Sequence, residues 1–391
     1  MNLPVADRLQ KLPPYLFAAL RKAMREAKAK GIEVIRVDIG DPDTAAPDPI
    51  VQELIRAVDD KNDPDRHRYG CDRPVAELPQ AVIDWYKRRY DVSLSADQVV
   101  MTMGSKDAIV KFCMGLLNPG DVGIAPLPGY PTYNIGHVFC SAVTHYVPLR
   151  AENGFLMDFD EIGHEVRQQA KILWLNYPNN PTSATADLDF FKRAVEFGRE
   201  NDILICHDAA YIENVYDGYE APSILQVDGA DEVAVEFYSL SKGFSMTGWR
   251  LGFVAGNASA VGALNTVKEN VDNGSLRALQ SAATVALEQA EQLVKPINKV
   301  YQRRRDMVVD MLNAAGWNLD KPKATIYIWA PVPDKYNGDS GKFVADLLAQ
   351  KGVMVTPGRG YGVTGEGFFR ISLSYPDDVL KEAIKRIIEM V

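Results

Sequence analysis

Short apolar runs alternate with helical patterns between residues 98 and 256. The runs span 99–103, 122–126, 143–147, 172–176, 203–207, 233–238 and 252–255. Helical patterns fill several of the intervals, for example 107–117 and 189–201. Strands that alternate with helices indicate an α/β fold, with a mostly parallel sheet covered by helices on both faces. This alternation therefore limits the chain to a small set of architectures.

The regions on either side of this core are mostly helical, with a few more strands. Helices are predicted at 18–30, 49–59, 75–90 and 288–312, and a strand at 34–39. A smaller α+β region follows, with strands at 325–330, 353–356 and 368–374 and helices at 341–350 and 376–390. We expect an N-terminal arm with part of a small domain (1–47), a large domain (48–284) and a small C-terminal domain (285–391).

Composition excludes several classes of protein. A chain of 391 residues can form a sizeable core, and its net charge of -9 argues against a nucleic-acid-binding surface. The four cysteines form no C-x-x-C pair and the five histidines lack metal-ligand spacing, so we expect reduced thiols and no metal site. No stretch approaches the roughly 18 apolar residues of a membrane span, so we expect a cytoplasmic protein.

Polar residues follow the predicted strands where each strand ends, which is where ligands bind in such sheets. Ser105 opens a helix whose free N–H groups would bind an anion, although it would serve equally well as an ordinary helix cap. Tyr130, between a glycine and a proline, offers a ring face, and Asn180 lies in a turn with two X-Pro steps. Asp208 follows a buried strand, where a carboxylate is costly unless it meets a cation.

The segment 239–252, SLSKGFSMTGWRLG, is predicted to form a polar loop between the last two strands. Lys242 is a candidate amine nucleophile, because lysine forms a Schiff base with a carbonyl. The neighbouring serines and Arg250 are donors suited to a phosphate. Together these residues indicate pyridoxal phosphate, which offers both an aldehyde and a phosphate. Asp208 would then meet the protonated pyridine nitrogen of that cofactor.

Some of these patterns allow other interpretations. Ser239 and Lys242 match the S-x-x-K motif of serine acylases, but no K-T-G motif follows, so we regard the match as accidental. Gly40, in the turn GDPD, is interpreted as a turn glycine, although glycine also permits close approach of a ligand. Arg370, inside a predicted strand, is either paired structurally or binds an anion such as a substrate carboxylate.

Taken together, the motifs resemble those of the class I aminotransferases, which are pyridoxal-phosphate enzymes of fold type I. PxPGYP, YPNNPT, HDAAY, SLSK-x-x-x-MTGWR-x-G and RISLS occur in the order found in that family. The resemblance implies a large domain with a mixed, mostly parallel seven-stranded sheet between helices, and a smaller α+β domain. It implies transamination between an L-amino acid and 2-oxoglutarate. It also implies a homodimer with each site at the interface.

The resemblance assigns roles residue by residue. Lys242 would bind the cofactor covalently, Asp208 would pair with its ring nitrogen, and Tyr211 would contact its ring oxygen together with Asn180. Tyr130 would cover the ring. The phosphate would be bound by Ser105, Lys106, Ser239, Ser241 and Arg250, joined by Tyr69 of the partner subunit. The substrate carboxylate would be bound by Arg370, Asn180 and the backbone of Gly40.

Within the family, LPPYLF, IGDPD, GSKDA, ENGF and HDAAY are most similar to the LL-diaminopimelate aminotransferases and their relatives, which implies lysine biosynthesis. This likeness would put Tyr15 and Asn273 near the substrate, with Lys268 and Arg277 as further candidates. The chain departs from the family after Tyr69, where the family has a glycine five residues on and an arginine ten residues on. The sequence has Pro74 and Pro79 at those positions, so the loop that carries Tyr69 would differ in shape.

Three alternative functions remain at this point. The chain could be a broader aminotransferase for alanine, glutamate or aromatic amino acids. It could be a pyridoxal-phosphate carbon–sulfur lyase, because one fold hosts many reactions. An amino-acid-sensing regulator is the third, but the acidic composition argues against DNA binding.

Overall fold

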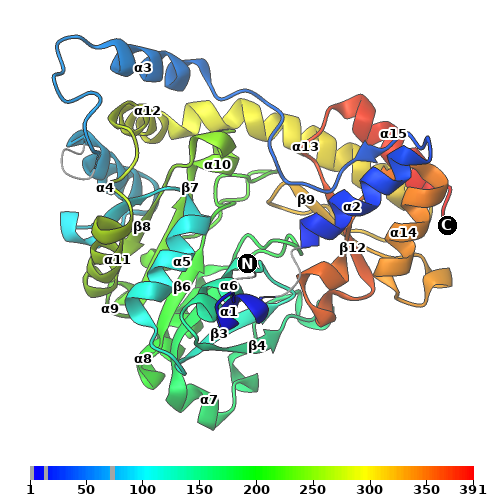
Figure 1. Ribbon diagram of the computed structural model, residues 1–391, viewed down its shortest axis with the longest axis horizontal. Helices are drawn as coiled ribbons and strands as arrows, with labels where there is room; N and C mark the ends of the chain where they lie inside the picture. The colour runs from blue at the N-terminus through cyan, green and yellow to red at the C-terminus, as the bar shows by residue number, and fades with distance from the viewer. Residues whose placement is uncertain (1–3, 13–15, 71–74) are drawn as a thin grey trace.

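The structure, a computed structural model, describes residues 4–12, 16–70 and 75–391. Its largest sheet has seven strands, which lie between helices (Figure 1). They are β2 (Val99–Thr102), β3 (Val122–Leu127), β4 (Val143–Pro148), β5 (Ala170–Leu175), β6 (Leu204–Asp208), β7 (Ala234–Ser239) and β8 (Gly252–Gly256). The strand order is β2-β8-β7-β6-β5-β3-β4. Of the seven strands, only β8 runs in the direction opposite to the others. The expected mixed, mostly parallel sheet is therefore confirmed.

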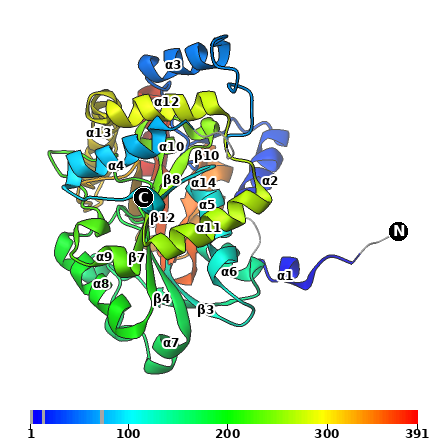
Figure 2. The ribbon, with the colours of Figure 1, turned by 90° about the vertical axis from the view of Figure 1, so that its left-hand side faces the viewer.

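Both faces of this sheet are buried under helices. The helices around it are α3 (Asp48–Asp59), α4 (Glu77–Tyr90), α5 (Ser105–Leu116), α6 (Thr132–Phe139), α7 (His164–Gln169), α8 (Leu188–Asn201), α9 (Ala230–Val233), α10 (Leu240–Gly243), α11 (Ala258–Val271) and α12 (Arg277–Glu288). Figure 2 shows α5, α6 and α11 on one side of the sheet and α4, α8 and α9 on the other. Each face of the sheet packs into its own apolar cluster. Ile205 belongs to one cluster and the next residue, Cys206, to the other, because successive side chains of a strand point to opposite faces.

A second, smaller unit lies beside the large sheet and has its own apolar cluster. Its strands are β1 (Ile35–Arg36), β9 (Tyr327–Pro331), β10 (Val353–Met354), β11 (Thr356–Pro357) and β12 (Phe368–Ser372). Its helices are α2 (Leu16–Ala29), α13 (Ala290–Ala314), α14 (Ser340–Lys351) and α15 (Asp377–Ile388), and a short α1 (Asp7–Gln10) precedes them. The N-terminal segment joins this unit, because β1 pairs in parallel with β10. The expected domain limits near residues 47 and 284 stay predictions.

Three local expectations differ from the structure. The helix predicted at 288–312 is preceded by another helix, and the two are separated at Gln289, whose φ of -110° and ψ of 17° are not helical. The strand predicted at 34–39 pairs with β10 only at residues 35–36, although the Val37 N–H still donates to the Met354 carbonyl oxygen at 2.9 Å. The polar loop around Lys242 contains the helical turn α10. Among the described residues, no helix is long and apolar enough to cross a membrane.

Close packing around Gly123 gives a test of this fold. A Cβ atom on Gly123 would lie 2.3 Å from the ring of the buried His137, so Gly123→Ala must displace that ring. We expect the substitution to lower the free energy of unfolding by about 1–3 kcal/mol in a denaturant titration. Gly163→Ala is the control, because nothing lies within 4 Å of its Cβ position and its φ of -61° suits alanine. Equal stability of the two variants would contradict the packing at β3.

Candidate active site

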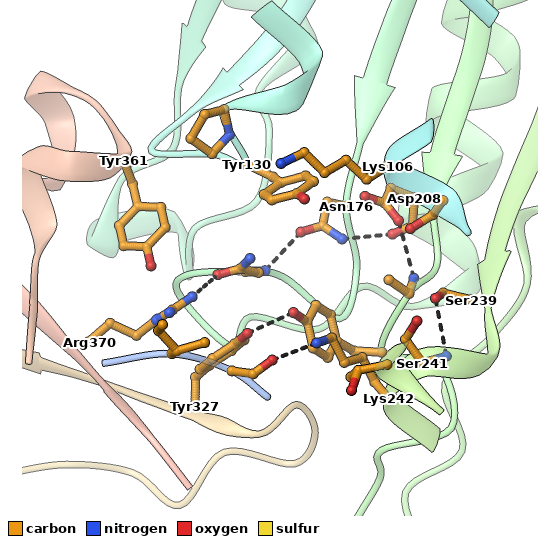
Figure 3. Close-up of a pocket in the computed structure, with 18 of the residues that line it drawn as sticks. Lys106, Tyr130, Asn176, Asp208, Ser239, Ser241, Lys242, Tyr327, Tyr361 and Arg370 are labelled. Carbon is orange, nitrogen blue, oxygen red and sulfur yellow. Dashed lines mark hydrogen bonds between the residues drawn. The ribbon is translucent and has the colours of Figure 1, made fainter. Parts of the chain in front are cut away.

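A cavity of about 430 Å³ lies at the carboxyl ends of the large sheet's strands, where the smaller unit meets them (Figure 3). Most of the site residues predicted from the sequence line it. They are Gly40, Ser105, Lys106, Tyr130, Asn180, Asp208, Tyr211, Ser239, Ser241, Lys242, Arg250 and Arg370. Segments far apart in the sequence therefore supply one site, as expected for the carboxyl edge of an α/β sheet.

Lys242 lies on the short helix α10, directly after β7. The hydroxyl of Ser239 caps this turn by accepting a hydrogen bond from the backbone N–H of Ser241 at 3.3 Å. The Lys242 amine donates to the carbonyl oxygen of Gly40 at 2.5 Å. Burial lowers the pKa of Lys242, which favours the neutral, nucleophilic amine.

Gly40 is more than a turn residue. A Cβ atom at this position would lie 1.9 Å from the hydroxyl oxygen of Tyr327, so a larger residue would collide with that ring. Tyr327 in turn shares a 2.8 Å hydrogen bond with the hydroxyl of Tyr211. The absence of a side chain at Gly40 therefore lets its carbonyl reach Lys242 while Tyr327 closes the cavity from the smaller unit.

Asp208 ends strand β6 and is only 3% exposed. Its carboxylate accepts a hydrogen bond from the Tyr133 hydroxyl at 2.8 Å and from the Ala210 N–H at 3.3 Å. Burial raises the pKa of Asp208 to about 6, although Tyr133, His207 and Ala210 each lower it. Among the described residues no basic side chain forms a salt bridge with Asp208. A buried acceptor without a counter-ion is suited to a cationic ligand.

The end of the cavity near α5 is built to bind an anion. Gly104 precedes α5 with a φ of +82°, which favours glycine, and a Cβ atom there would lie 2.6 Å from an Arg250 Nη atom. The guanidinium of Arg250 therefore lies against the backbone at the N-terminus of α5. Ser105, Ser239 and Ser241 line the same cavity with hydroxyl groups. A helix N-terminus with an arginine and hydroxyl donors suits a phosphate.

Arg370 points into the cavity from β12 of the smaller unit (Figure 3). One Nη donates to the side-chain oxygen of Asn180 at 2.6 Å and the other to the carbonyl oxygen of Asp38 at 2.8 Å. The guanidinium carbon lies 3.9 Å from the centre of the Tyr327 ring. The buried Nε has no hydrogen-bond partner, and within the described residues no carboxylate forms a salt bridge with Arg370. A buried guanidinium in this state is suited to an anionic ligand.

The sequence did not identify several polar residues of the site, among them Asn176, Tyr133, Tyr327 and Tyr361. Asn176 donates to the Asp208 carbonyl oxygen at 2.7 Å and accepts from the Asn180 N–H at 2.8 Å, and its position at a strand end was the available signal. Tyr133 follows Tyr130 by three residues, so both lie near the start of α6. Tyr327 and Tyr361 come from the smaller unit; Tyr327 lies in the strand predicted at 325–330, and Tyr361 lies between predicted elements.

Two predicted residues lie away from the cavity. Tyr69 is 65% exposed and Asn273 is exposed, and neither lines the cavity of the chain to which it belongs. Their segments are neighbours, because the Gln280 side chain donates to the carbonyl oxygens of both Gly70 (3.3 Å) and Ser275 (2.9 Å). Lys268 and Arg277 also lie outside the cavity and form ion pairs with Asp272 and Asp63. Tyr15 and Pro74 lie outside the described residues.

Pro74 and Pro79 predict a different shape for the chain after Tyr69, and Pro79 lies within the described residues. Pro79 lies in the first turn of α4, where a proline is tolerated because that N–H has no partner within the helix. Pro79 is therefore accommodated in the first turn of a regular helix.

The raised pKa of Asp208 predicts how the cofactor-free protein responds to pH. Between pH about 4 and 6 the unfolded chain loses this proton while the folded chain keeps it, so stability falls as pH rises. We expect the free energy of unfolding of Asp208→Asn to rise by about 2 kcal/mol relative to that of the wild type between pH about 4 and 7. Denaturant titrations across this range measure the difference. A difference that does not change with pH would show that Asp208 is already ionised in the folded chain.

Comparison with known proteins places this geometry in a family. The family model for class I and II aminotransferases matches residues 32–387. An LL-diaminopimelate aminotransferase of Moorella thermoacetica is 45% identical over 98% of this chain and 97% of its own length. Another from Desulforudis audaxviator is 46% identical over 99% of this chain and 98% of its own length.

Solved structures agree with these relatives. Substrate-bound BacF from Bacillus subtilis has a TM-score of 0.93 and 35% identity, covering 100% of this chain and 98% of its own. An aminotransferase from Staphylococcus aureus has a TM-score of 0.90 and 31% identity, covering 99% of both chains. With a lysine, a buried aspartate and a buried arginine around one cavity, and this similarity over nearly the whole length, the chain belongs to the class I and II aminotransferases.

Proposed function

We propose that the protein transfers an amino group between LL-diaminopimelate and 2-oxoglutarate, a reaction of lysine biosynthesis. The observation that carries amino transfer is that Lys242, Asp208 and Arg370 face one cavity. The choice of LL-diaminopimelate is supported by relatives with that name, which are 42–46% identical over almost the entire chain. We also propose that the protein works in the cytoplasm.

Aminotransferases of this family use pyridoxal phosphate, and the cavity suits it. An acceptor without a counter-ion (Asp208), an amine with a lowered pKa (Lys242) and an anion-binding end (Ser105, Arg250) are the three groups that the cofactor's cationic nitrogen, aldehyde and phosphate require. When bound, the cofactor supplies an aldehyde that takes up the amino group and a ring that accepts electrons from the substrate α-carbon.

We assign the residues that would hold it as follows. Asp208 pairs with the ring nitrogen, Tyr211 and Asn180 contact the ring oxygen, and Tyr130 covers the ring. The phosphate would be bound by Ser105, Lys106, Ser239, Ser241 and Arg250, which line the cavity, and by Tyr69 of the partner subunit. The substrate carboxylate is bound by Arg370, Asn180 and the backbone of Gly40.

Proton transfer at the substrate α-carbon falls to Lys242. Its amine is held at the carbonyl of Gly40, and burial lowers its pKa, which favours the neutral form that acts as a base. Arg370 would fix the substrate carboxylate, and Asn180 and the Asp38 carbonyl already fix the orientation of Arg370. The α-carbon would thereby be presented to Lys242 in a defined orientation.

Lys242→Ala tests the chemistry. Loss of the Lys242 amine should remove the absorption band of the lysine-bound cofactor and lower the rate of amino transfer roughly 10²- to 10⁴-fold or more. Transfer from LL-diaminopimelate to 2-oxoglutarate is followed by glutamate formation, and far-ultraviolet circular dichroism checks that the variant is folded. Release of ammonia and a keto acid by the wild type, without glutamate, would instead identify a lyase. Full activity in Lys242→Ala would remove the lysine from the mechanism.

We further propose that the protein is a homodimer in which Tyr69 and Asn273 of each subunit contact the site of the other. Both residues are exposed, their segments lie side by side, and neither reaches the cavity of its own chain. A symmetric dimer would place both at the partner's cavity with a single interface.

Hybrid dimers of Lys242→Ala and Tyr69→Ala test this arrangement. Each variant alone should be nearly inactive, but the hybrid has one site with an intact lysine and an intact tyrosine. Co-expression of the two chains should therefore restore roughly a quarter of wild-type activity. Co-expression of two Lys242→Ala chains with different tags is the control and should stay inactive. A failure of the hybrid to regain activity would mean that Tyr69 acts within its own subunit, and full activity of Tyr69→Ala alone would mean that Tyr69 has no role.

A further inference from the structure

The protein has two completely buried histidines with different surroundings, and His137 is the simpler one. Both rings are 0% exposed. The Trp174 indole N–H donates to Nε2 of His137 at 3.1 Å, and an indole can only donate, so this nitrogen carries no proton. The other nitrogen lies 2.9 Å from the Thr144 hydroxyl. Burial lowers the pKa of His137 to about 4, so this ring is neutral.

Both ring nitrogens of His207 face oxygen atoms that accept hydrogen bonds. Nδ1 lies 2.8 Å from a carboxylate oxygen of Glu236, and Nε2 lies 2.7 Å from the carbonyl oxygen of Tyr177. A carbonyl oxygen has no hydrogen to offer, so Nε2 must carry a proton. If Glu236 is ionised, Nδ1 must carry one as well, and the ring is a cation.

The surroundings of Glu236 favour its ionised form. Besides His207, its two oxygens accept hydrogen bonds from the hydroxyl of Tyr86 at 2.8 Å, the hydroxyl of Ser223 at 2.9 Å and the N–H of Ile224 at 3.1 Å. A carboxylate surrounded by donors on all sides is stabilised as an anion, whereas a protonated carboxyl would have to give up one acceptor position. Glu236 is 0% exposed, and a buried anion requires a paired cation.

Among the described residues no other basic side chain contacts Glu236, and Arg89 of α4 pairs with Glu213 instead. The titratable groups around the pair are Tyr86 and Tyr90 from α4, Tyr177 from the loop after β5, and Asp208 on β6 itself. Burial raises the pKa of each of these three tyrosines, so they stay neutral. The neighbour from α8 is the ring of Phe191, whose centre lies 4.7 Å from that of His207. Within the described residues, His207 is therefore the group that would pair with an ionised Glu236.

His207 and Glu236 lie on the face of the sheet opposite to the side chain of Asp208. His207 and Glu236 are register partners on the adjacent strands β6 and β7, and their contacts come from α4, α8 and the 223–224 turn. Asp208 is the next residue along β6, and successive side chains of a strand point to opposite faces. The cation of His207 thus lies one residue behind the carboxylate that faces the cavity.

We propose that His207 is a positioning residue, kept doubly protonated by Glu236, which favours the ionised form of Asp208 and holds the backbone of the Asn180 loop. This proposal rests on the proposed function, in which Asp208 meets the cofactor's ring nitrogen and Asn180 contacts its ring oxygen. The charge acts on Asp208 along β6. The Nε2–H group acts on Tyr177, three residues before Asn180, which in turn contacts Arg370.

Its direct test needs neither cofactor nor activity. In protein with ¹⁵N-labelled histidine, long-range ¹H–¹⁵N correlation spectra at pH about 7 report the protonation of each ring nitrogen. We expect the signals of His207, assigned by their absence from His207→Gln, to show two protonated nitrogens, and those of His137, assigned by their absence from His137→Gln, to show one unprotonated nitrogen. Glu236→Gln should convert the His207 signals to those of a neutral ring. A neutral His207 in the wild type would overturn the proposal, and amino transfer could still be correct.

A second measurement separates positioning from a merely structural role. Removal of the cation should make Asp208 harder to ionise. The pH at which cofactor binding is half-maximal, followed by the absorption of the bound cofactor, should therefore rise by about one unit in Glu236→Gln. His137→Gln is the matched control, since it perturbs a buried but neutral histidine, and its midpoint should equal that of the wild type. An unchanged midpoint in a folded Glu236→Gln variant would contradict the effect on Asp208.

Discussion

Charged side chains without counter-ions at the carboxyl edge of a parallel sheet are the constraint on which the structure depends. Asp208 and Arg370 are almost completely buried, yet within the described residues neither is neutralised by an opposite charge. Such groups destabilise a folded chain unless hydrogen bonds and a ligand compensate them. The large sheet, the smaller unit and the Tyr327 ring between them hold these groups in place for that ligand.

Each of these groups is held by neutral contacts. Asp208 accepts from Tyr133 and the backbone, Arg370 donates to Asn180 and a carbonyl oxygen, and Lys242 donates to the carbonyl of Gly40. Neutral contacts orient a charged group without cancelling its charge. The cavity therefore keeps one acceptor for a cation and one donor for an anion. The ion pair of His207 and Glu236, on the other face of the sheet, would extend this pattern by placing a cation near Asp208 without using up its carboxylate.

The sequence predicted the elements and motifs whose signals are local. Seven apolar runs correspond to seven strands, and the polar residues at their ends line one cavity, because parallel strands bring their carboxyl ends to the same edge. The strict glycine at position 40 was not foreseen, since its reason is a tyrosine 287 positions along the chain, at 327. The turn α10 was not foreseen either, because four residues carry no helical period.

Residues from distant segments were the hardest to predict. Tyr361 and Tyr133 lie in no recognised motif, and their roles follow only from where the smaller unit and α6 meet the sheet. The charge state of His207 also depends on a partner 29 residues away on the neighbouring strand. Tyr69 and Asn273 lie away from the cavity of their own chain, which the local sequence around them does not predict. Their proposed role requires a second subunit.

The most direct test of amino transfer from LL-diaminopimelate is a single-turnover scan. The cofactor-loaded protein is mixed separately with LL-diaminopimelate, glutamate, alanine and phenylalanine, without a keto acid, while the absorption of the lysine-bound cofactor is followed. Rapid loss of that absorption with LL-diaminopimelate and glutamate, and not with alanine or phenylalanine, is the predicted result. Loss with alanine or phenylalanine and none with LL-diaminopimelate would contradict the proposed substrate.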